Sequence, residues 1–204
     1  MKYKYYTVHS FDLKKGAMKR IFLVFLVFTF LTSADIEVSD VTYKSRLSFK
    51  NEQYVLNGAG VRGKFFFDLY TIGLYLKEKS TDGNLILNSI SKKLIKITVV
   101  SSLITADRFS NGMDDGFEKS TNGNTDSIAR EIAELKKGFG KDFNVGDKFT
   151  LFFDSDGSTT IFKETNLQVK IPPSYAFQKA LLGMWIGEDP VVGDLKEELL
   201  GVDK

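Results

Sequence analysis

The sequence contains no cysteine and a single histidine, His9. Without cysteine the chain cannot form disulfides, use a thiol nucleophile or carry a lipid on a cysteine. Because His9 lies within the first 34 residues, the rest of the chain has no imidazole for a Ser-His-Asp triad, a general base or a metal site. Any proton transfer must therefore use Arg, Lys, Tyr, Asp, Glu or water.

The sequence also lacks an apolar run of the roughly 20 residues that a membrane-spanning helix needs. Its longest N-terminal run, residues 21–31, follows Lys19-Arg20 and precedes Thr32-Ser33-Ala34. A basic start, a short apolar core and a small-residue exit are typical of a secretory signal peptide. We therefore expect residues 1–34 to be an N-terminal extension and signal peptide, with translation starting at Met1 or Met18. The mature protein would begin near Asp35 and be periplasmic or secreted, with no stable membrane span.

Residues 35–204, without this leader, carry no excess of positive charge. The first 34 residues hold six of the 28 Lys and Arg residues but one of the 26 Asp and Glu residues, which leaves residues 35–204 with a net charge of −3. That segment has four arginines. A mildly acidic domain with few arginines is a poor nucleic-acid binder, so we expect no nucleic-acid partner. The sequence leaves the oligomeric state open.

The hydrophobic patterns of residues 35–204 predict one α+β domain. Extended segments come first, helical periodicity occupies the middle, and strands and then helices return without regular β-α alternation, which favours an antiparallel sheet with helices packed on one face. Expected strands cover 38–49, 53–56, 64–76, 94–100, 148–153, 159–163 and 167–171. Expected helices follow the caps Thr81-Asp82, Thr105, Asp126 and Asp189-Pro190, and a further helix is expected after Pro172-Pro173-Ser174.

Residues 57–76 are the most informative stretch. Gly58, Gly60 and Gly63 predict a turn over 57–63 that places Arg62 at the mouth of a long strand, because glycine allows backbone conformations that a side chain forbids. From Lys64 on, one strand face is predicted to carry Phe65, Phe67, Leu69, Thr71 and Tyr75, and the other Phe66, Tyr70, Ile72, Leu74 and Leu76. Both faces are largely apolar, so the strand is expected to be covered on both sides. A fixed cation beside an apolar wall suits an amphipathic ligand.

Two formal motifs in the sequence do not predict a cofactor or metal site. Residues 58–63 match G-x-G-x-x-G, but the glycines lead into a strand, whereas a dinucleotide site needs a helix N-terminus there. Asp154-Ser-Asp156-Gly157 resembles the start of a calcium loop, but Thr165 stands where the closing glutamate would be, so a hairpin turn is the better interpretation. We expect no cofactor and no bound metal.

Three blocks of the sequence together resemble the chalcone isomerase family, including its bacterial chalcone isomerase-like members and the related fatty-acid-binding proteins. They are residues 57–76, residues 101–119, and residues 177–197 around Trp185. The resemblance spans roughly residues 40–201 and implies a chalcone isomerase-like open-faced β-sandwich. It is less specific for activity, since the family contains both enzymes and non-catalytic binders.

The resemblance implies roles for Arg62 and Tyr70. Arg62 matches the family's principal substrate-contacting arginine, which stabilises developing negative charge in the enzymes and holds the carboxylate in the binders. Tyr70 stands where the plant enzymes carry a threonine that contacts the ketone through water. From the residues alone, Arg62 could equally be a solvated turn arginine or pair with Asp68, and Tyr70 could be a half-buried strand residue.

Other polar positions of the plant enzymes are not matched. A tyrosine and an asparagine of the enzymes' helix correspond here to Arg108 or Phe109 and to Asp115 or Gly116, depending on the alignment. A threonine or serine beside Trp185 is replaced by Met184. The site implied by the resemblance therefore comprises Arg62, Tyr70, Arg108, Phe109, Asp115 and Met184. Arg108 could also be a solvated helix residue, and Trp185 is expected in the core.

Three hypotheses follow. The first is an exported binder of an apolar or phenolic small molecule with an anionic or carbonyl end, without chalcone cyclisation activity. The second is an isomerase, an intramolecular lyase acting on a phenolic or enone substrate, with Arg62 as electrophile and Tyr70 or water relaying protons. The third is a structural or partner-binding role without a ligand. The missing polar contacts favour the first hypothesis over the second.

Overall fold

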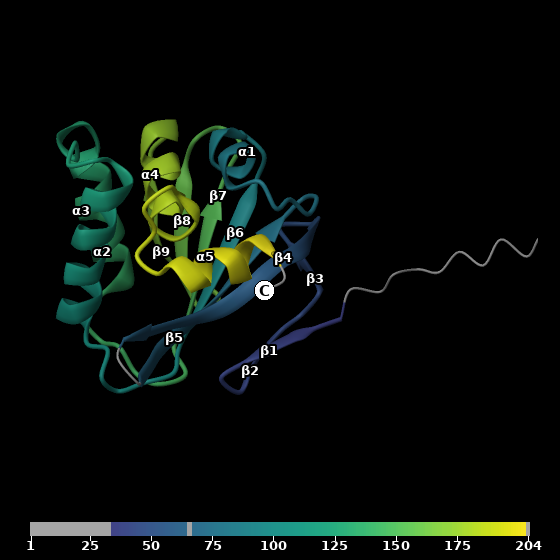
Figure 1. Cartoon of the computed structure of the whole chain (residues 1–204). Helices are drawn as coiled ribbons and strands as arrows, with labels where there is room; N and C mark the ends of the chain where they lie inside the picture. The colour runs from purple at the N-terminus through teal and green to yellow at the C-terminus, as the bar shows by residue number, and fades with distance from the viewer. Residues whose placement is uncertain (1–33, 65–66, 203–204) are drawn as a thin grey trace, which may run out of the picture. The chain divides into compact units, whose positions relative to one another are not determined.

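The structure, a computed structural model, describes residues 34–64 and 67–202. The predicted extension and signal peptide at 1–34, apart from its last residue, lie outside the described residues, as do Phe65 and Phe66. Residues 33–204 form one compact unit, which is α+β as predicted (Figure 1). Its elements, in chain order, are β1 (Ile36–Val38), β2 (Val41–Tyr43), β3 (Arg46–Phe49), β4 (Glu52–Lys64), β5 (Phe67–Leu76), α1 (Gly83–Asn88), β6 (Lys93–Val99), α2 (Ala106–Ser120), the 3-10 turn η1 (Asp126–Ile128), α3 (Ala129–Phe139), β7 (Lys148–Phe153), β8 (Thr159–Lys163), β9 (Asn166–Ile171), α4 (Tyr175–Ile186) and α5 (Gly193–Leu200).

Strands β3 to β9 form one antiparallel sheet in which every strand pairs with its sequence neighbour. The helices gather on one face of this sheet, which we call the helix face (Figure 1). The opposite face packs against the β1–β2 hairpin and is called the hairpin face. The expectation that strand 64–76 is covered on both sides is confirmed for Tyr70 to Leu76, which are buried, but not for Phe67 and Asp68, which are exposed.

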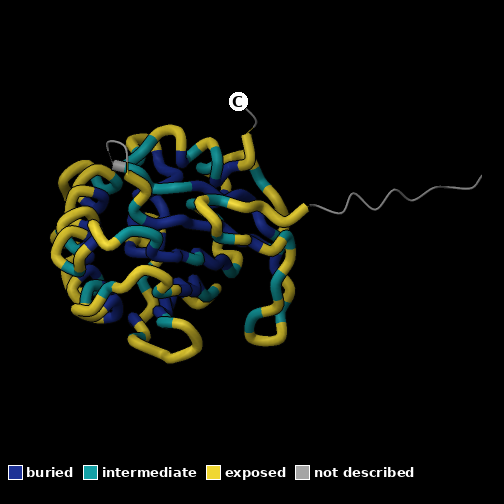
Figure 2. The backbone as a smooth tube through the Cα atoms, turned by 90° about the horizontal axis from the view of Figure 1, so that it is seen from below, coloured by how far each residue is buried: buried dark blue, intermediate teal, exposed yellow. Residues whose placement is uncertain are grey.

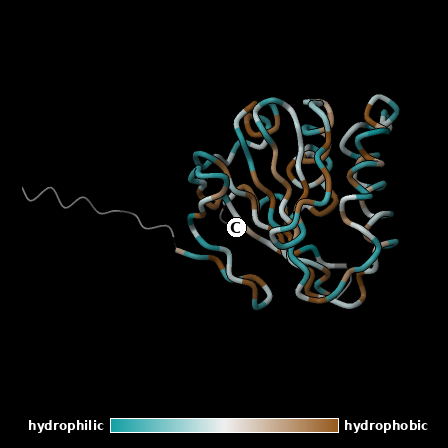
Figure 3. Tube along the Cα trace, turned by 180° about the vertical axis from the view of Figure 1, so that it is seen from behind, coloured by the Kyte–Doolittle hydropathy of each residue, from teal (hydrophilic) through white to brown (hydrophobic). Residues whose placement is uncertain are grey.

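Buried apolar side chains form two clusters, one on each face. The larger cluster joins the inward residues of β5 to β9 to the helices, and the smaller one surrounds Tyr43 of the hairpin. The buried backbone runs through the middle of the sheet and the inner sides of the helices (Figure 2). Seen from behind, the sheet strands carry many of the hydrophobic residues (Figure 3). The alternation predicted for β5 holds from Tyr70 on, since Tyr70, Ile72, Leu74 and Leu76 lie in the larger cluster and Tyr75 in the smaller one. It is wrong for Leu69, which packs against the larger cluster because the β4–β5 register is irregular between Arg62 and Gly63.

Two helix starts agree with the predicted caps, at Asp82 and Thr105, and the helix predicted after Pro172-Pro173-Ser174 is capped by Ser174. The side chains of Asp82, Thr105 and Ser174 accept hydrogen bonds from the amides of the first turns of α1, α2 and α4. Such caps satisfy amides that have no partner within the helix. On α2, Phe109, Met113 and Phe117 are buried on one side, as their four-residue spacing predicts.

The predicted cap at Asp189-Pro190 is wrong. Helix α5 begins at Gly193, and its N-cap residue, Val192, makes no side-chain capping bond. The Asp189 carboxylate instead accepts a hydrogen bond from Lys119 at 3.0 Å, and the amide of Val191 donates to the carbonyl of Met184. The chain is therefore still turning away from α4 where the sequence suggested a new helix.

Asp126 does not cap a helix either. It opens η1, and α3 follows from Ala129 without a side-chain cap. The segment 38–49, expected to be one extended run, is broken at Ser39 and Asp40, whose backbone φ angles are positive, 45° and 63°. These two residues form the β1–β2 turn, and Lys50 and Asn51 form the predicted turn between β3 and β4 with φ of 49° and 62°.

The predicted glycine turn at 57–63 is wrong in a way that matters for the site. Strand β4 runs through these residues to Lys64, and none of the described glycines among them has a positive φ. The glycines provide space instead. A Cβ on Gly58 would collide with the backbone carbonyls of Glu198 and Leu199, so α5 packs directly on the β4 backbone. The conformational freedom of glycine suggested a turn, but the absence of a side chain is what this packing requires.

Among the described residues, no helix has both the length and the apolar character to cross a membrane.

Candidate functional site

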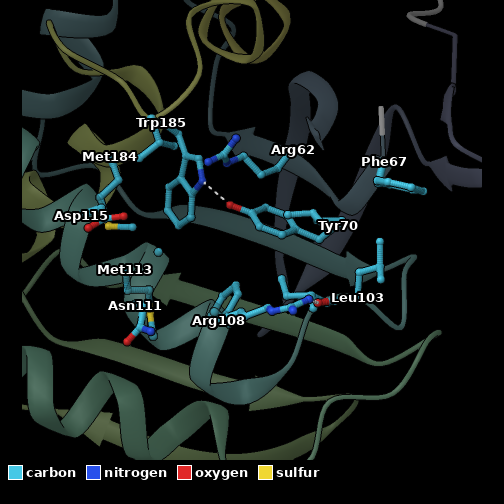
Figure 4. A pocket seen from close by; sticks show the side chains of 15 residues that line it. Arg62, Phe67, Tyr70, Leu103, Arg108, Asn111, Met113, Asp115, Met184 and Trp185 are labelled. Atoms are coloured by element: carbon cyan, nitrogen blue, oxygen red, sulfur yellow. Dashed lines mark hydrogen bonds between the residues drawn. The ribbon is translucent and has the colours of Figure 1, made fainter. Parts of the chain in front are cut away.

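A cavity of about 340 Å³ lies on the helix face, between the paired ends of β4 and β5 and helices α2 and α4 (Figure 4). Its walls are mainly apolar, with a few polar side chains, which is the usual character of a small-molecule site. It is lined by Arg62, Phe67, Leu69, Tyr70, Leu103, Ile104, Arg108, Phe109, Asn111, Gly112, Met113, Asp115, Met184, Trp185 and Val191. The six predicted site residues are all among them.

Strand register brings Arg62 and Tyr70 together. They are direct partners in the antiparallel β4–β5 ladder, just before an irregularity between Arg62 and Gly63. Opposed residues of an antiparallel pair project to the same face, with Cβ atoms about 5 Å apart. The same register places Gly58 and Gly60 opposite Leu74 and Ile72 on the helix face. Helix α5 can lie over the two glycines, and Arg62 is the next residue of that face to carry a side chain.

Arg62 has no acidic partner among the described residues. Its Nη1 donates a 2.6 Å hydrogen bond to the carbonyl of Gly63, which orients the guanidinium without neutralising it. The suggested partner, Asp68, instead accepts a 2.5 Å hydrogen bond from the hydroxyl of Ser39. Arg62 is half-buried, so its charge is only partly hydrated. A planar, permanently charged donor at the cavity wall can bind a carboxylate or polarise a carbonyl.

Tyr70 is buried, and its hydroxyl points toward Trp185 (Figure 4). The indole Nε1 of Trp185 donates a hydrogen bond to this hydroxyl at 3.1 Å. Burial raises the pKa of Tyr70, and the Trp185 hydrogen bond and the Arg62 charge oppose that rise. The hydroxyl therefore stays protonated near neutral pH. Its proton has no acceptor within 34–64 or 67–202, so it is free to donate to a ligand.

The sequence left two alternatives, Arg108 and Phe109, for the tyrosine position of the plant enzymes. Both residues line the cavity. Arg108 is exposed, and its Nη1 donates to the carbonyl of Leu103 at 2.7 Å. It makes no ion pair with the described residues. Phe109 is buried and meets the ring of Tyr70 edge-on, with centroids 5.8 Å apart at 71°. Arg108 thus adds a cation at the rim, and Phe109 fixes the Tyr70 ring from the cavity wall.

Asp115 and Met184 lie farther along α2 and α4. The exposed side chain of Asp115 contributes to the cavity rim. Its alternative, Gly116, is not a lining residue and instead makes room for Met184, since a Cβ on Gly116 would collide with that side chain. Met184 is buried and presents an apolar surface to the cavity.

Sequence reasoning missed several lining residues. Trp185 lies in the core as expected, but it also reaches the cavity and holds the Tyr70 hydroxyl. Leu103 and Ile104 come from the segment between β6 and α2, and Asn111 and Gly112 from α2. The helical periodicity of α2 predicts that Met113 is buried. It does not distinguish a residue of the core from one that lines a cavity. The described residues contain no group of three acidic or other metal-ligating side chains that could hold a metal ion.

Comparisons with known proteins agree with this geometry. No curated protein matches the sequence. Among solved structures, the fatty-acid binding protein AtFAP1 of Arabidopsis thaliana superposes with a TM-score of 0.65 at 14% identity, over 81% of this chain and 95% of that one. At this identity the likeness shows a shared fold. The chalcone isomerase-like family model matches residues 35–201. Because that match covers most of the sequence and agrees with the fold, the chain belongs to the chalcone isomerase-like family.

Proposed function

We propose that this protein binds an apolar small molecule with an anionic or carbonyl end in the cavity beside β4 and β5. The observation that carries the proposal is the cross-strand pair of Arg62 and Tyr70, which places one cation without an acidic partner and one free hydroxyl donor beside a mainly apolar wall. Arg108 supplies a second cation without an acidic partner at the rim. The structural likeness to a fatty-acid binding protein supports the same ligand class.

The polar groups of the cavity favour one protonation state of the ligand. Arg62 is charged at all physiological pH values, and Tyr70 remains a neutral donor because burial raises its pKa. Both groups can donate to a ligand oxygen, and neither accepts readily from a ligand. An ionised carboxylate or a carbonyl oxygen can accept hydrogen bonds from both donors. An alcohol also carries a donor of its own, which would find no ready acceptor on Arg62 or Tyr70. The surrounding apolar walls would hold the hydrocarbon part.

An isomerase acting on a phenolic or enone substrate is the second candidate. The same pair could act as an electrophile, with Arg62 stabilising an enolate oxygen and Tyr70 donating a proton. The surrounding wall argues against chalcone cyclisation, since Phe109 and Met184 are apolar where the resemblance leads one to expect polar contacts. We propose little or no turnover of a standard chalcone. An absorbance assay tests this, and turnover well above the spontaneous rate that Arg62→Ala abolishes would establish the enzyme instead.

We also propose export, with the mature chain beginning near Asp35. The support is the basic, apolar and small-residue pattern over residues 18–34. N-terminal sequencing of the protein from its native cells decides the matter, and an intact intracellular chain that retains residues 18–34 would contradict it.

Calorimetry with a long-chain acid tests the binding function. Arg62→Ala should weaken binding by about one to two decades, because a charge-assisted hydrogen bond contributes roughly 1.5–3 kcal/mol. Arg62→Lys should recover part of the affinity, since lysine keeps the charge but loses the planar fork. Arg130→Ala is the matched control, because Arg130 lies on α3, is exposed and does not line the cavity.

The neutral alcohol of the same chain length completes the design. Wild type should bind the acid more tightly than the alcohol, and Arg62→Ala should remove most of that preference. Equal binding of acid and alcohol by wild type, or undiminished binding of the acid by Arg62→Ala, would show that Arg62 is a structural residue.

A further inference from the structure

Several residues that line the cavity are exposed, and they come from different elements. Phe67 and Leu103, 57% and 40% exposed, lie at one end, and the exposed residues Asn111, Gly112 and Asp115 of α2 lie at the other. In Figure 4, Phe67 and Leu103 lie on one side of Tyr70, and Asn111 and Asp115 lie on the other. The end at Phe67 and Leu103 also carries the exposed Arg108, which donates to the carbonyl of Leu103, whereas the end at α2 is bordered by an amide and a carboxylate. We call the end at α2 the α2 opening.

Gly112 at the α2 opening has no packing reason to be glycine. A Cβ placed on it would meet nothing within 4 Å, whereas a Cβ on Gly116, one turn farther along α2, would collide with Met184. Glycine inside a helix is less stable than alanine by roughly 0.5–1 kcal/mol. At Gly116 packing accounts for glycine. At Gly112 no atom packs against the position, so a larger side chain there could extend over the α2 opening.

An apolar path leads from the polar centre to this opening. Met113 and Met184 are buried, line the cavity and lie on the same side of Tyr70 as Asp115 and Asn111 (Figure 4). Methionine side chains are flexible and polarisable, so this wall can adapt to a hydrocarbon chain of variable shape. The cavity volume of about 340 Å³ is near the lower end of the roughly 300–1,000 Å³ typical of ligand sites. A long ligand would fill it and still need an exit.

We infer that Gly112 keeps a window open in α2 through which the tail of a long-chain ligand leaves the cavity, so that this position sets the ligand length the protein accepts. The inference rests on the proposed function, which places the polar end of the ligand at Arg62 and Tyr70. The tail then runs past Met113 and Met184 and reaches solvent at Gly112. Ligands short enough to end inside the cavity do not use the window.

Two substitutions at this position separate the window from the helix. Gly112→Leu places a branched side chain across the opening, while Gly112→Ala adds one methyl group and leaves it open. Both substitutions should raise the melting temperature of the protein or leave it unchanged, because leucine and alanine favour a helix more than glycine does. Glu118→Leu is the matched control for an added leucine, since Glu118 is an exposed α2 residue that does not line this cavity.

Binding is measured by calorimetry for octanoic and hexadecanoic acids and for their alcohols. Gly112→Leu should lose at least about tenfold in affinity for the sixteen-carbon ligands, because their tails lose apolar contacts, and change by less than about twofold for the eight-carbon ligands. Gly112→Ala and Glu118→Leu should bind all four like wild type. A Gly112→Leu protein that binds both chain lengths like wild type, or loses both equally, overturns the inference.

The alcohols distinguish failure of this inference from failure of the proposed function. If wild type binds acids and alcohols equally but Gly112→Leu still discriminates by length, the window stands and the carboxylate role of Arg62 falls. If wild type prefers acids and Gly112→Leu does not discriminate by chain length, the window inference is wrong and the proposed function is supported. If wild type binds none of the four ligands, both are wrong.

Discussion

Adjacent residues of β5 show how differently the two faces of the sheet are built. On the hairpin face, Thr71 is fully buried and its hydroxyl accepts a 2.9 Å hydrogen bond from Tyr43. On the helix face, Tyr70 accepts a hydrogen bond from Trp185, and its own proton has no acceptor in the described chain. Burial raises the pKa of both tyrosines. One hydroxyl is used to hold the fold together, and the other is left available beside a cavity.

The burial and polarity of a side chain do not by themselves mark a binding site. Tyr43 and Tyr70 are similar in residue type and burial, at 3% and 7% exposed. They differ in whether the surrounding elements fill the space around the hydroxyl. The hairpin packs its own side chains onto one face, whereas the ends of β4, β5 and α2 leave a hollow on the other.

The largest expected effect concerns two glycines: one lets α5 approach the helix face of the sheet, and the other lets the β1–β2 hairpin approach the hairpin face. Gly58→Ala should destabilise the protein by about 3 kcal/mol or more, because its Cβ meets the backbone of α5, which cannot move alone. Gly73→Ala should cost roughly 1–3 kcal/mol, since its Cβ meets the ring of Tyr43, a side chain that can shift. Urea unfolding measures both. A larger loss at Gly73 than at Gly58 would contradict the packing of α5 on β4.

A smaller effect separates the two tyrosine hydroxyls. Tyr43→Phe should destabilise the protein by about 1–2 kcal/mol and leave ligand affinity unchanged, because it removes a buried hydrogen bond on the hairpin face, opposite the cavity. Tyr70→Phe should cost less stability, since water in the cavity can replace the lost partner of Trp185, but should weaken binding of an acid or ketone by up to about tenfold. The variants are compared by unfolding and calorimetry. Equal effects of both variants on binding would refute the contrast.

The smallest effect appears only at alkaline pH. Burial raises the pKa of Tyr43 from its ordinary value near 10 to about 12, although hydrogen bonds with Thr71 and Thr98 act against the rise. Between pH 10 and 12 the unfolded chain therefore holds fewer protons at this position, so stability should fall as the pH rises through this window. In Tyr43→Phe the fall should be shallower than in wild type. Parallel pH profiles of the two proteins would show that Tyr43 does not contribute.

Much of the fold follows from local patterns in the sequence. Thr105 predicts a helix start because a hydroxyl before an apolar-periodic run satisfies free amides. From Tyr70 to Leu76 the alternation in β5 predicts which side chains share a face, because strand side chains alternate where the register is regular. The resemblance also brought together six residues that line one cavity, although periodicity alone could not distinguish cavity from core.

Other features depended on contacts between segments distant in sequence. Asp189 looked like a cap but bonds Lys119, 70 residues away. The glycines at 58 and 60 looked like a turn, but they serve the close approach of α5, more than 130 residues later. Local propensity cannot anticipate such contacts, because their energy comes from the partner rather than from the segment itself.

Composition excluded thiol chemistry and, beyond residue 34, imidazole chemistry, and it set the net charge of residues 35–204. Local patterns predicted the succession of strands, helices, strands and helices and one arginine beside an aromatic strand, but not the division of residues 36–64 into β1 to β4. The tertiary structure decided that Arg62 faces Tyr70, that Trp185 holds the tyrosine hydroxyl, and that Gly112 borders an open space while Gly116 is filled by Met184. The physical reason is that composition and periodicity belong to each segment, whereas strand register and empty volume arise only when several segments pack together.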